Sequence, residues 1–259
     1  MKTAKVNYHV TSHEPQAFHI DANGVKGNLV SPILEAHEIE LEDIRKSNFD
    51  LKFSADSITF VNFPTKIKDF GDKTDWKELY NQEINNLLVE ELNAKDVIVF
   101  DHTIRLDDPD ALRKPARNVH GDYSVKGAHH RLHDILGSDK SIEWEKGHFG
   151  FVNIWRPLHA PVNSSPLGFI HPKSVKSDDW VNIGLIYPDR KGHILGLVQN
   201  ADHQWIYMSK MTPDEVAIFN VYDNQGLAPI GHSALDGIED VSQPNIRMSL
   251  ESRALVRYS

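Results

Sequence analysis

The chain has 259 residues, 40% of them hydrophobic, with a formal net charge of −9 and no cysteine. This length can bury a substantial core, whereas the acidic balance argues against nucleic acid and anionic membrane surfaces as partners. The lack of cysteine excludes disulfides, zinc–thiolate sites and thiol nucleophiles. No apolar run approaches a membrane span and no signal core follows Met1, so we expect a cytoplasmic protein.

The first 94 residues predict short strands followed by one helix. Alternating apolar residues predict strands near residues 6–10 and 37–41, and a hairpin whose arms are residues 49–53 and 58–61. Apolar residues at helical spacing predict a helix over 75–93, where Asp75 and Glu78 resemble a capping box.

The middle of the chain predicts a buried strand at 97–105 and a polar, proline-containing loop at 106–117. A strand is expected at 118–123, and then a helix from residue 124 to 136 that ends at Gly137.

From residue 149 onward the pattern is mostly β. Short strands are predicted within 149–208, and a long strand or strand pair at 246–258. Thr212, Pro213 and Glu215 predict the start of a short helix, and residues 217–222 either continue it or form a strand. With no linker or repeat, the pattern predicts one mainly β domain with flanking helices, of the jelly-roll or barrel type.

The motif His120-Gly121-Asp122 offers two metal ligands. Residues two apart point the same way on an extended strand, so one imidazole and one carboxylate can lie together. His232 is the best candidate for a third ligand. Two histidines and one carboxylate leave three positions open on an octahedral metal, as in non-haem Fe(II) oxygenases. Because the chain has 15 histidines, a chance pairing is the competing interpretation.

Arg247 and Ser249 form a second candidate group. On a strand they place a guanidinium and a hydroxyl on one face, which can hold one end of a dicarboxylate. The competing interpretation for Arg247 is a surface salt bridge. His129 and His133 share a helix face and could bind zinc, but a structural role is favoured because the pair lacks the intervening glutamate of metalloproteases.

Several motifs in order resemble the gibberellin-desaturase and cephem-methoxylase-related family of Fe(II)/2-oxoglutarate oxygenases. The resemblance covers residues 95–258 well and residues 1–94 more loosely. The matching motifs are His120-Gly121-Asp122-Tyr123, Asn153-Ile154-Trp155-Arg156-Pro157, Pro166-Leu167, His203-Gln204-Trp205-Ile206-Tyr207, Met211-Thr212-Pro213-Asp214-Glu215, Tyr222-Asp223, His232-Ser233-Ala234 and Arg247-x-Ser249-x-Glu251-x-Arg253.

The chain also departs from the family pattern. Gly231 stands where the family often has proline, and Ser233-Ala234-Leu235 replaces the usual Thr-Ala-Phe. Met248 and Leu250 flank Ser249 where glutamate and isoleucine are more usual. All the chemically required residue types are present, so the departures concern the pocket lining near His232.

The resemblance implies a double-stranded β-helix, a cupin-like jelly roll, formed by residues 95–258 and flanked by residues 1–94 in a single domain of residues 1–259. It implies His120, Asp122 and His232 as iron ligands, and Arg247 with Ser249 as the holder of the far carboxylate of 2-oxoglutarate. Arg253 is a rival for that role.

Two further residues are weighed on the same basis. Arg156 is expected either to face the same pocket, where it would contact 2-oxoglutarate or substrate, or to be a structural turn residue, with equal weight. Tyr123 would point to the opposite face of an ideal strand from Asp122, so we expect it to pack.

The implied activity uses Fe(II), 2-oxoglutarate and O2 to oxidise an unactivated C–H bond of a small secondary metabolite. Hydroxylation, desaturation and cyclisation all remain open, with succinate and CO2 as co-products. A zinc hydrolase with the same ligands and a non-catalytic cupin-like binding module are the rival interpretations. The sequence identifies neither the substrate nor the oligomeric state, and a homo-oligomer is compatible with it.

Overall fold

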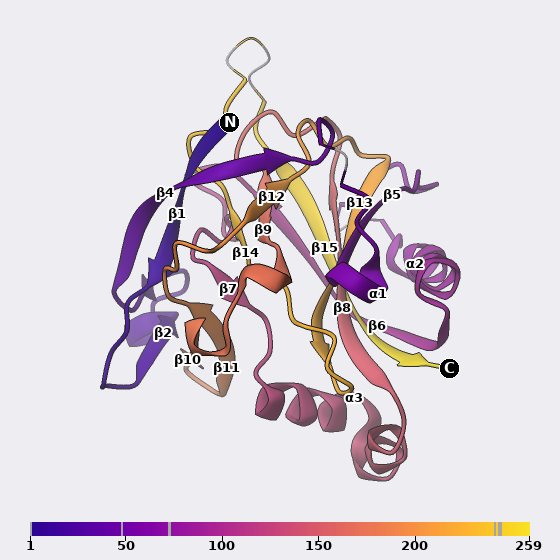
Figure 1. Cartoon of the computed structure of the whole chain (residues 1–259). Helices are drawn as coiled ribbons and strands as arrows, with labels where there is room; N and C mark the ends of the chain where they lie inside the picture. Colours follow the sequence, from indigo (N-terminus) through magenta and orange to yellow (C-terminus); the bar gives the residue numbers. More distant parts are fainter. Residues whose placement is uncertain (1, 48, 72–73, 241, 243–244) are drawn as a thin grey trace.

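Two β-sheets dominate the structure (Figure 1). The computed structural model describes residues 2–47, 49–71, 74–240, 242 and 245–259. One sheet has ten strands and the other has five, and the helices lie at their margins. The expected mainly β architecture with flanking helices is confirmed. Within the described residues, no helix combines the length and apolarity needed to cross a membrane.

Eight strands form a jelly-roll core. They are β6 (Ala94–Leu106), β7 (His120–Gly121), β8 (Phe149–Pro157), β9 (Leu167–Ile170), β11 (Lys191–Leu197), β13 (Glu215–Asp223), β14 (His232–Ala234) and β15 (Met248–Tyr258). Within the two sheets their orders are β9-β14-β7-β11 and β13-β8-β15-β6, and all these neighbours are antiparallel. The chain crosses repeatedly between the sheets, which therefore face each other around a common interior.

The remaining strands extend these two sheets. In the larger sheet, β12 (Trp205–Tyr207), β4 (Leu34–Asp43) and β1 (Lys2–His9) continue beyond β9, while β10 (Trp180–Ile186), β2 (Gln16–Ile20) and β3 (Leu29–Val30) continue beyond β11. The strand β5 (Ile58–Asn62) borders β13 in the smaller sheet. Short 3-10 helices are η1 (Ala22–Gly24), η2 (Pro172–Ser174) and η3 (Ser177–Asp179).

The helix α2 (Lys77–Leu92) covers the outer face of the smaller sheet (Figure 1). Its buried side chains Tyr80, Ile84 and Leu88 belong to the same apolar cluster as Val152 of β8. The predicted helix is confirmed. The predicted capping box is wrong, because Trp76 is the N-cap residue and no side chain caps this end.

The helix α3 (Val125–Glu145) is divided by a glycine. Its first turn is capped by Ser124, whose hydroxyl accepts a hydrogen bond from the N–H of Gly127. At Gly137 the backbone takes φ 73° and ψ 170°, which is not helical. Glycine adopts this conformation without a Cβ clash, so the helix breaks there and then resumes. The predicted end at Gly137 describes the first half only.

Two local predictions are wrong. Residues 49–61 do not form a hairpin, because α1 (Phe53–Asp56) replaces one arm and Ser57 turns the chain with a left-handed φ of 62°. Near Thr212 no helix forms, and Glu215 instead begins β13. The carboxylate of Glu215 does accept the backbone N–H of Thr212, as in a capping box. Pairing with both β5 and β8 then holds the following residues extended.

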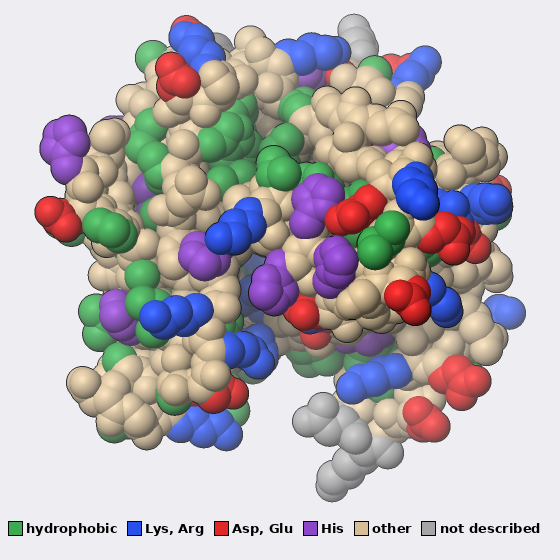
Figure 2. Space-filling view, turned by 90° about the horizontal axis from the view of Figure 1, so that it is seen from below, with side chains coloured by type: hydrophobic (Ala, Val, Ile, Leu, Met, Phe, Trp, Pro, Cys, Tyr) green, Lys and Arg blue, Asp and Glu red, His purple; other side chains and the backbone are tan. Residues whose placement is uncertain are grey.

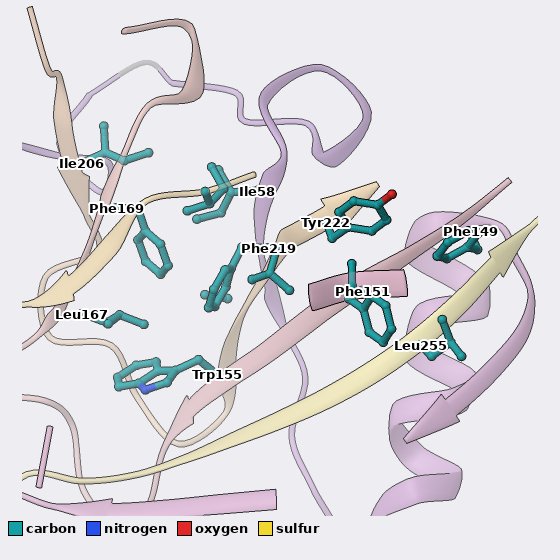
Figure 3. Packing of buried hydrophobic residues seen from close by; sticks show 14 of the residues in the cluster. Ile58, Phe149, Phe151, Trp155, Leu167, Phe169, Ile206, Phe219, Tyr222 and Leu255 are labelled. Atoms are coloured by element: carbon teal, nitrogen blue, oxygen red, sulfur yellow. The ribbon is translucent and has the colours of Figure 1, made fainter. Parts of the chain in front are cut away.

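The interior between the sheets is aromatic at one end (Figure 3). On β8, Phe149, Phe151 and Trp155 point into this cluster, whereas Val152 and Ile154 pack toward α2. This alternation is the period of two expected of a strand buried on both faces. One face of β8 therefore packs in the interior between the sheets, and the other packs against α2.

Replacing Leu88 with alanine should lower the free energy of unfolding by about 2–5 kcal/mol, because the side chain is fully buried beneath α2 and its loss leaves a cavity. Val89, the next residue, is 45% exposed. Val89→Ala should change the unfolding free energy by no more than about 0.5 kcal/mol. Urea denaturation of both variants measures the difference, and equal effects would contradict the described packing of α2.

Candidate metal centre

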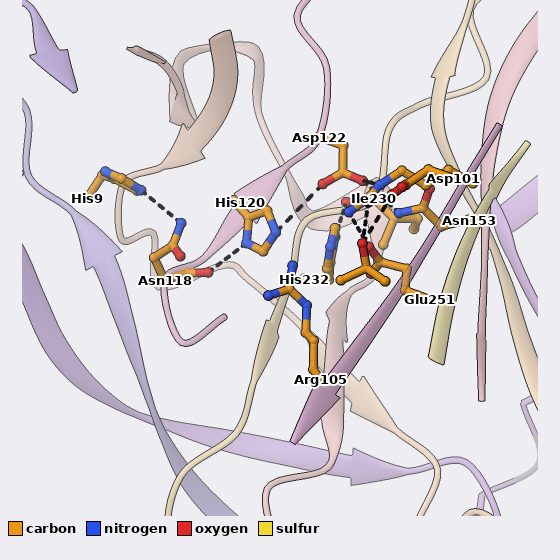
Figure 4. Close-up of polar contacts among 12 residues, drawn as sticks. His9, Asp101, Arg105, Asn118, His120, Asp122, Asn153, Ile230, His232 and Glu251 are labelled. Carbon is orange, nitrogen blue, oxygen red and sulfur yellow. Dashed lines mark hydrogen bonds and ion pairs between the residues drawn. The ribbon is translucent and has the colours of Figure 1, made fainter. Parts of the chain in front are cut away.

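Two histidines meet across a pair of neighbouring strands. His120 of β7 lies directly opposite His232 of β14, and their ring centroids are 4.3 Å apart. Asp122 follows immediately after β7, and its Oδ1 lies 3.7 Å from Nε2 of His120. One ligand atom from each of the three residues lies within 4.8 Å of the others, as Figure 4 shows from close by. The structure therefore brings together the three predicted metal ligands.

Backbone carbonyls fix both imidazoles in one tautomer. Nδ1–H of His120 donates to the carbonyl of Asn118 at 2.8 Å, and Nδ1–H of His232 donates to the carbonyl of Ile230 at 3.2 Å. Each Nε2 is then left with its lone pair available to a metal. Burial, followed by the charge of His232, lowers the pKa of His120 to about 3, so His120 is neutral at physiological pH.

The opposite sheet holds one oxygen of Asp122. Nδ2–H of Asn153 donates to Oδ2 at 2.7 Å, and Nε of Arg253 lies 3.5 Å from the same oxygen. Burial alone would raise the pKa of Asp122, but the charge of Arg253, the largest opposing influence, holds it well below its usual range. Oδ2 is occupied by these contacts, so Oδ1 is the oxygen left to face a metal.

The strand register explains how Arg253 and Asn153 come together. On the inner face of the smaller sheet, three rows of residues run across β6, β15 and β8. The rows are Asp101–Arg253–Asn153, Thr103–Glu251–Trp155 and Arg105–Ser249–Pro157. Polar side chains in these rows face the candidate metal ligands from across the interior.

Arg253 is occupied by carboxylates. Nη1 lies 2.6 Å from Asp101, Nη2 donates to Glu251, and Nε faces Asp122. Although burial would lower the pKa of Arg253, these three carboxylates raise it. Its guanidinium thus orients Asp122 and neutralises the carboxylates of Asp101 and Glu251.

Arg247 is buried but only partly satisfied. Nη1–H donates to the carbonyl of Ser165 at 2.5 Å and Nη2–H to Oγ of Ser249 at 3.2 Å, while the guanidinium lies over the ring of Trp155. Its buried Nε has no hydrogen-bond partner among the described residues. Burial lowers the pKa of Arg247 to about 9, so it still carries its charge at neutral pH. An unpaired buried cation of this kind is suited to an anionic ligand.

One small pocket joins the histidines to Arg247. Its empty volume, including its opening, is about 270 Å³. Its lining consists of Arg105, Ala116, His120, Trp155, Leu167, His232, Ala234, Arg247 and Glu251. The pocket thus has a ligand set for a metal at one side and a guanidinium beside it.

Arg156 does not belong to this pocket. It lies on the same face of β8 as Val152 and Ile154, fully buried against α2. Its guanidinium lies 5.4 Å from the ring centroid of Tyr80, and Nη2–H donates to the carbonyl of Phe63. The expectation that Arg156 faces the pocket does not hold, because it is an odd number of residues from both Asn153 and Trp155 on β8.

Three residues at the site were not predicted from the sequence, namely Arg105, Asn153 and Glu251. Asn153 and Glu251 stood within recognised motifs but were given no role, whereas Arg105 lies outside every motif. The signal for Asn153 was its even spacing from Trp155 on one strand. Arg105 can be assigned to the site only from its pairing opposite Ser249 on β15, which the sequence does not predict.

Other candidates have structural contacts. Tyr123 packs against Phe151, with ring centroids 4.9 Å apart, in line with the expected packing. His129 bonds to Glu145 and Tyr222, and His133 to Ser141. Figure 2 shows histidine side chains close together on the face that carries α3. Within the described residues, His120, Asp122 and His232 form the only group with metal-binding separations.

Gly121 lets the larger sheet pack tightly beside the ligands. A Cβ at this position would lie 2.9 Å from the ring of Trp180 on β10. A side chain there would displace the indole or β7 itself, which carries His120. A glycine between the two ligands is therefore required by the packing.

Comparisons with known proteins agree with this geometry. A family model described as an oxidoreductase/YMDC permease-like domain matches residues 6–257. The hydroxylase/desaturase efuI of Hormonema carpetanum is 30% identical over 248 residues, covering 84% of this chain and 82% of the relative. The alpha-ketoglutarate-dependent dioxygenase phiK of a fungal species (strain ATCC 74256) is 28% identical, covering 92% and 90%.

The fold also matches solved structures. The iron and alpha-ketoglutarate-dependent endoperoxidase NvfI superposes with a TM-score of 0.86 at 20% identity, covering 100% of this chain and 98% of that chain. This likeness confirms the expected double-stranded β-helix. The family match spans nearly the whole chain, and the recognised motifs lie within it in order. The chain therefore belongs to this oxidoreductase family, the family of Fe(II)/2-oxoglutarate-dependent oxygenases that includes the fungal hydroxylase/desaturases.

Proposed function

We propose that this protein is a non-haem Fe(II)/2-oxoglutarate-dependent oxygenase that oxidises an unactivated C–H bond of a small secondary metabolite. The observation that carries the proposal is the convergence of His120, Asp122 and His232 next to a pocket that joins both histidines to Arg247, whose buried Nε lacks a hydrogen-bond partner among the described residues. A ligand set of two histidines and one carboxylate suits Fe(II) and leaves positions open for other ligands. Its relatives phiK and efuI are named as a dioxygenase and a hydroxylase/desaturase, respectively.

We assign the three ligands to iron and Arg247 with Ser249 to the far carboxylate of 2-oxoglutarate. Arg253, the rival for that carboxylate, already contacts three carboxylates of the chain. The buried Nε of Arg247, in contrast, lacks a partner among the described residues. This difference supports Arg247 as the binding residue and Arg253 as a positioning residue for Asp122.

Bound Fe(II) and 2-oxoglutarate would supply the activation of O2 and the oxidising power, with succinate and CO2 as products. The chain holds the proposed ligands in position and excludes water from the pocket. Carbonyls behind His120 and His232 keep each Nε2 aimed at the metal, and Asn153 keeps one oxygen of Asp122 turned away from it. Trp155 and Leu167 line the pocket with apolar surface, which limits the access of water to the reacting atoms.

The same proposal places the enzyme in the cytoplasm, acting on a small molecule. Ala116 at the end of the 106–117 loop and Ala234 after the 223–231 connection both line the pocket. We therefore expect the 106–117 loop to contribute to the choice of substrate. Hydroxylation, desaturation and cyclisation are alternative outcomes that depend on where the substrate is held.

Two other functions would use the same residues differently. A zinc hydrolase would need no O2 or 2-oxo acid, and it leaves the unpaired Arg247 beside the ligands unexplained. A cupin-like binding module would need no metal, and it leaves the tautomer-fixed pair His120 and His232 unexplained. The three functions therefore differ in whether they need a metal and whether they need O2 and a 2-oxo acid.

The first measurement concerns the metal. His120→Ala and His232→Ala should each weaken Fe(II) binding at least about 100-fold, since loss of a direct ligand should cost more than loss of an outer contact. Anaerobic calorimetric titration with Fe(II) measures this. His130→Ala is the matched control, because the side chain of His130 is 77% exposed on α3 and should leave binding unchanged. If all three variants bind Fe(II) with the same affinity, His120 and His232 are not iron ligands.

The second measurement separates the three functions. Anaerobic addition of Fe(II) and 2-oxoglutarate to the wild type should give a weak visible charge-transfer band. Admission of O2 should then release succinate, slowly even without the organic substrate. A protein that binds metal but shows neither signal would contradict the proposed oxygenase and favour the hydrolase.

The third measurement concerns the co-substrate. Arg247→Gln should weaken 2-oxoglutarate binding by roughly 10- to 100-fold, because a charge-assisted pair with the far carboxylate is lost. The charge-transfer band, titrated with 2-oxoglutarate, gives the dissociation constant. Fe(II) affinity should stay within about threefold of the wild type, and an unchanged 2-oxoglutarate affinity would argue against the role of Arg247.

A further inference from the structure

The pocket contains a second guanidinium, that of Arg105 on β6. In Figure 4 this side chain reaches from its strand toward His120 and His232. Its hydrogen bond is donated by Nη1 to the backbone carbonyl of Lys114, at 3.0 Å. Among the described residues, Arg105 has no carboxylate within ion-pair distance, although the charges of Glu251 and Asp122 act on it from further away. Arg105 is thus a cation without a direct counter-ion.

Arg105 and Arg247 lie close enough to repel each other. Arg105 pairs directly opposite Ser249, which itself accepts a hydrogen bond from Arg247. After burial, the charge of Arg105 is the largest cause that lowers the pKa of Arg247. Arg247 is buried and Arg105 is half-buried, and two neighbouring cations destabilise each other unless an anion lies between them.

The charges around the pocket divide into two groups. At the metal end, the three carboxylates of Asp122, Glu251 and Asp101 surround the single cation Arg253, so the group has a formal charge of −2. Arg105 and Arg247 add +2 beside it. Fe(II) offsets the charge of the first group, and the far carboxylate of a 2-oxo dicarboxylate would face the second group, where both guanidiniums can donate to it.

We propose that Arg105 and Arg247 clamp the far carboxylate of 2-oxoglutarate from two neighbouring strands, so that Arg105 is a co-substrate specificity residue outside the Arg-x-Ser motif. This inference rests on the proposed oxygenase function. It assigns a role to a residue that lies 15 positions before the first recognised motif, which begins at His120, and is brought to the site by the pairing of β6 with β15. The clamp selects 2-oxo acids that carry a second carboxylate.

The test compares two ligands that differ only at the far end. The ligand 2-oxopentanoate has a methyl group where 2-oxoglutarate has its second carboxylate, and it retains the groups that chelate iron. Arg105→Gln should weaken binding of 2-oxoglutarate by roughly 10- to 100-fold, since a charge-assisted contact is lost. Binding of 2-oxopentanoate should stay within about threefold of the wild type. Anaerobic titration of the charge-transfer band gives both dissociation constants.

Two further variants control for charge and folding. Arg113→Gln removes the same charge from an exposed position in the neighbouring loop, and should leave the preference for 2-oxoglutarate unchanged. Arg105→Lys keeps the charge but loses the planar fork, so it should weaken 2-oxoglutarate binding less than Arg105→Gln does. It also provides the measurement if the glutamine variant fails to fold. Fe(II) binding without co-substrate confirms that each variant retains its metal site.

Three results would overturn the clamp. If Arg105→Gln leaves both affinities unchanged, Arg105 does not contact the co-substrate. If both ligands weaken equally, Arg105 acts near the metal or on the carboxylate that both ligands share. If the wild type gives no band with either ligand, the proposed oxygenase function fails and the clamp fails with it.

Discussion

The contact between Asp122 and the pair Asn153 and Arg253 is the interaction on which the site depends. Asp122 follows β7 in the larger sheet, while its partners lie on β8 and β15 of the smaller one. The carboxylate therefore connects the two sheets beside His120 and His232, the other two proposed metal ligands. Because β7 has only two residues, its own pairing cannot fix a side chain that follows it. The direction of Asp122 is set by the opposite sheet, and the separation of the sheets determines the geometry of the ligand set.

The interior is divided between polar and aromatic halves along the same strands. Toward one end, Phe149 and Phe151 of β8 fill the space with rings. Toward the other end, Asn153 of β8 and Arg253 of β15 form a polar network with Asp122. Trp155 belongs to the apolar cluster and also lies beneath Arg247. The aromatic half supplies burial energy, while in the polar half the carboxylates of Asp101, Asp122 and Glu251 are stabilised by Arg253.

Much of this arrangement could be predicted from the sequence, because local periodicity carries it. The spacing of two between Arg247 and Ser249 placed both correctly on one face, and the apolar spacing in α2 predicted that helix. The same parity rule, applied to β8, would have placed Arg156 away from Trp155. Arg105 could not be found in this way, since its place depends on the register of two strands separated by more than 140 residues. The helix expected at Thr212 failed for the same reason, because pairing with two strands overrode a local hydrogen bond.

The separation of negative and positive groups in one pocket has a consequence for how the enzyme is loaded. With only the metal bound, the pocket would carry an excess of positive charge, and with only the dianion bound, an excess of negative charge. Each ligand therefore relieves an imbalance that the other creates. If both ligands bind as proposed, their binding is thermodynamically coupled, and by linkage each must raise the affinity of the other by the same factor. Such reciprocity favours two populations, the empty protein and the complex with both metal and 2-oxoglutarate, over forms that hold only one of the two.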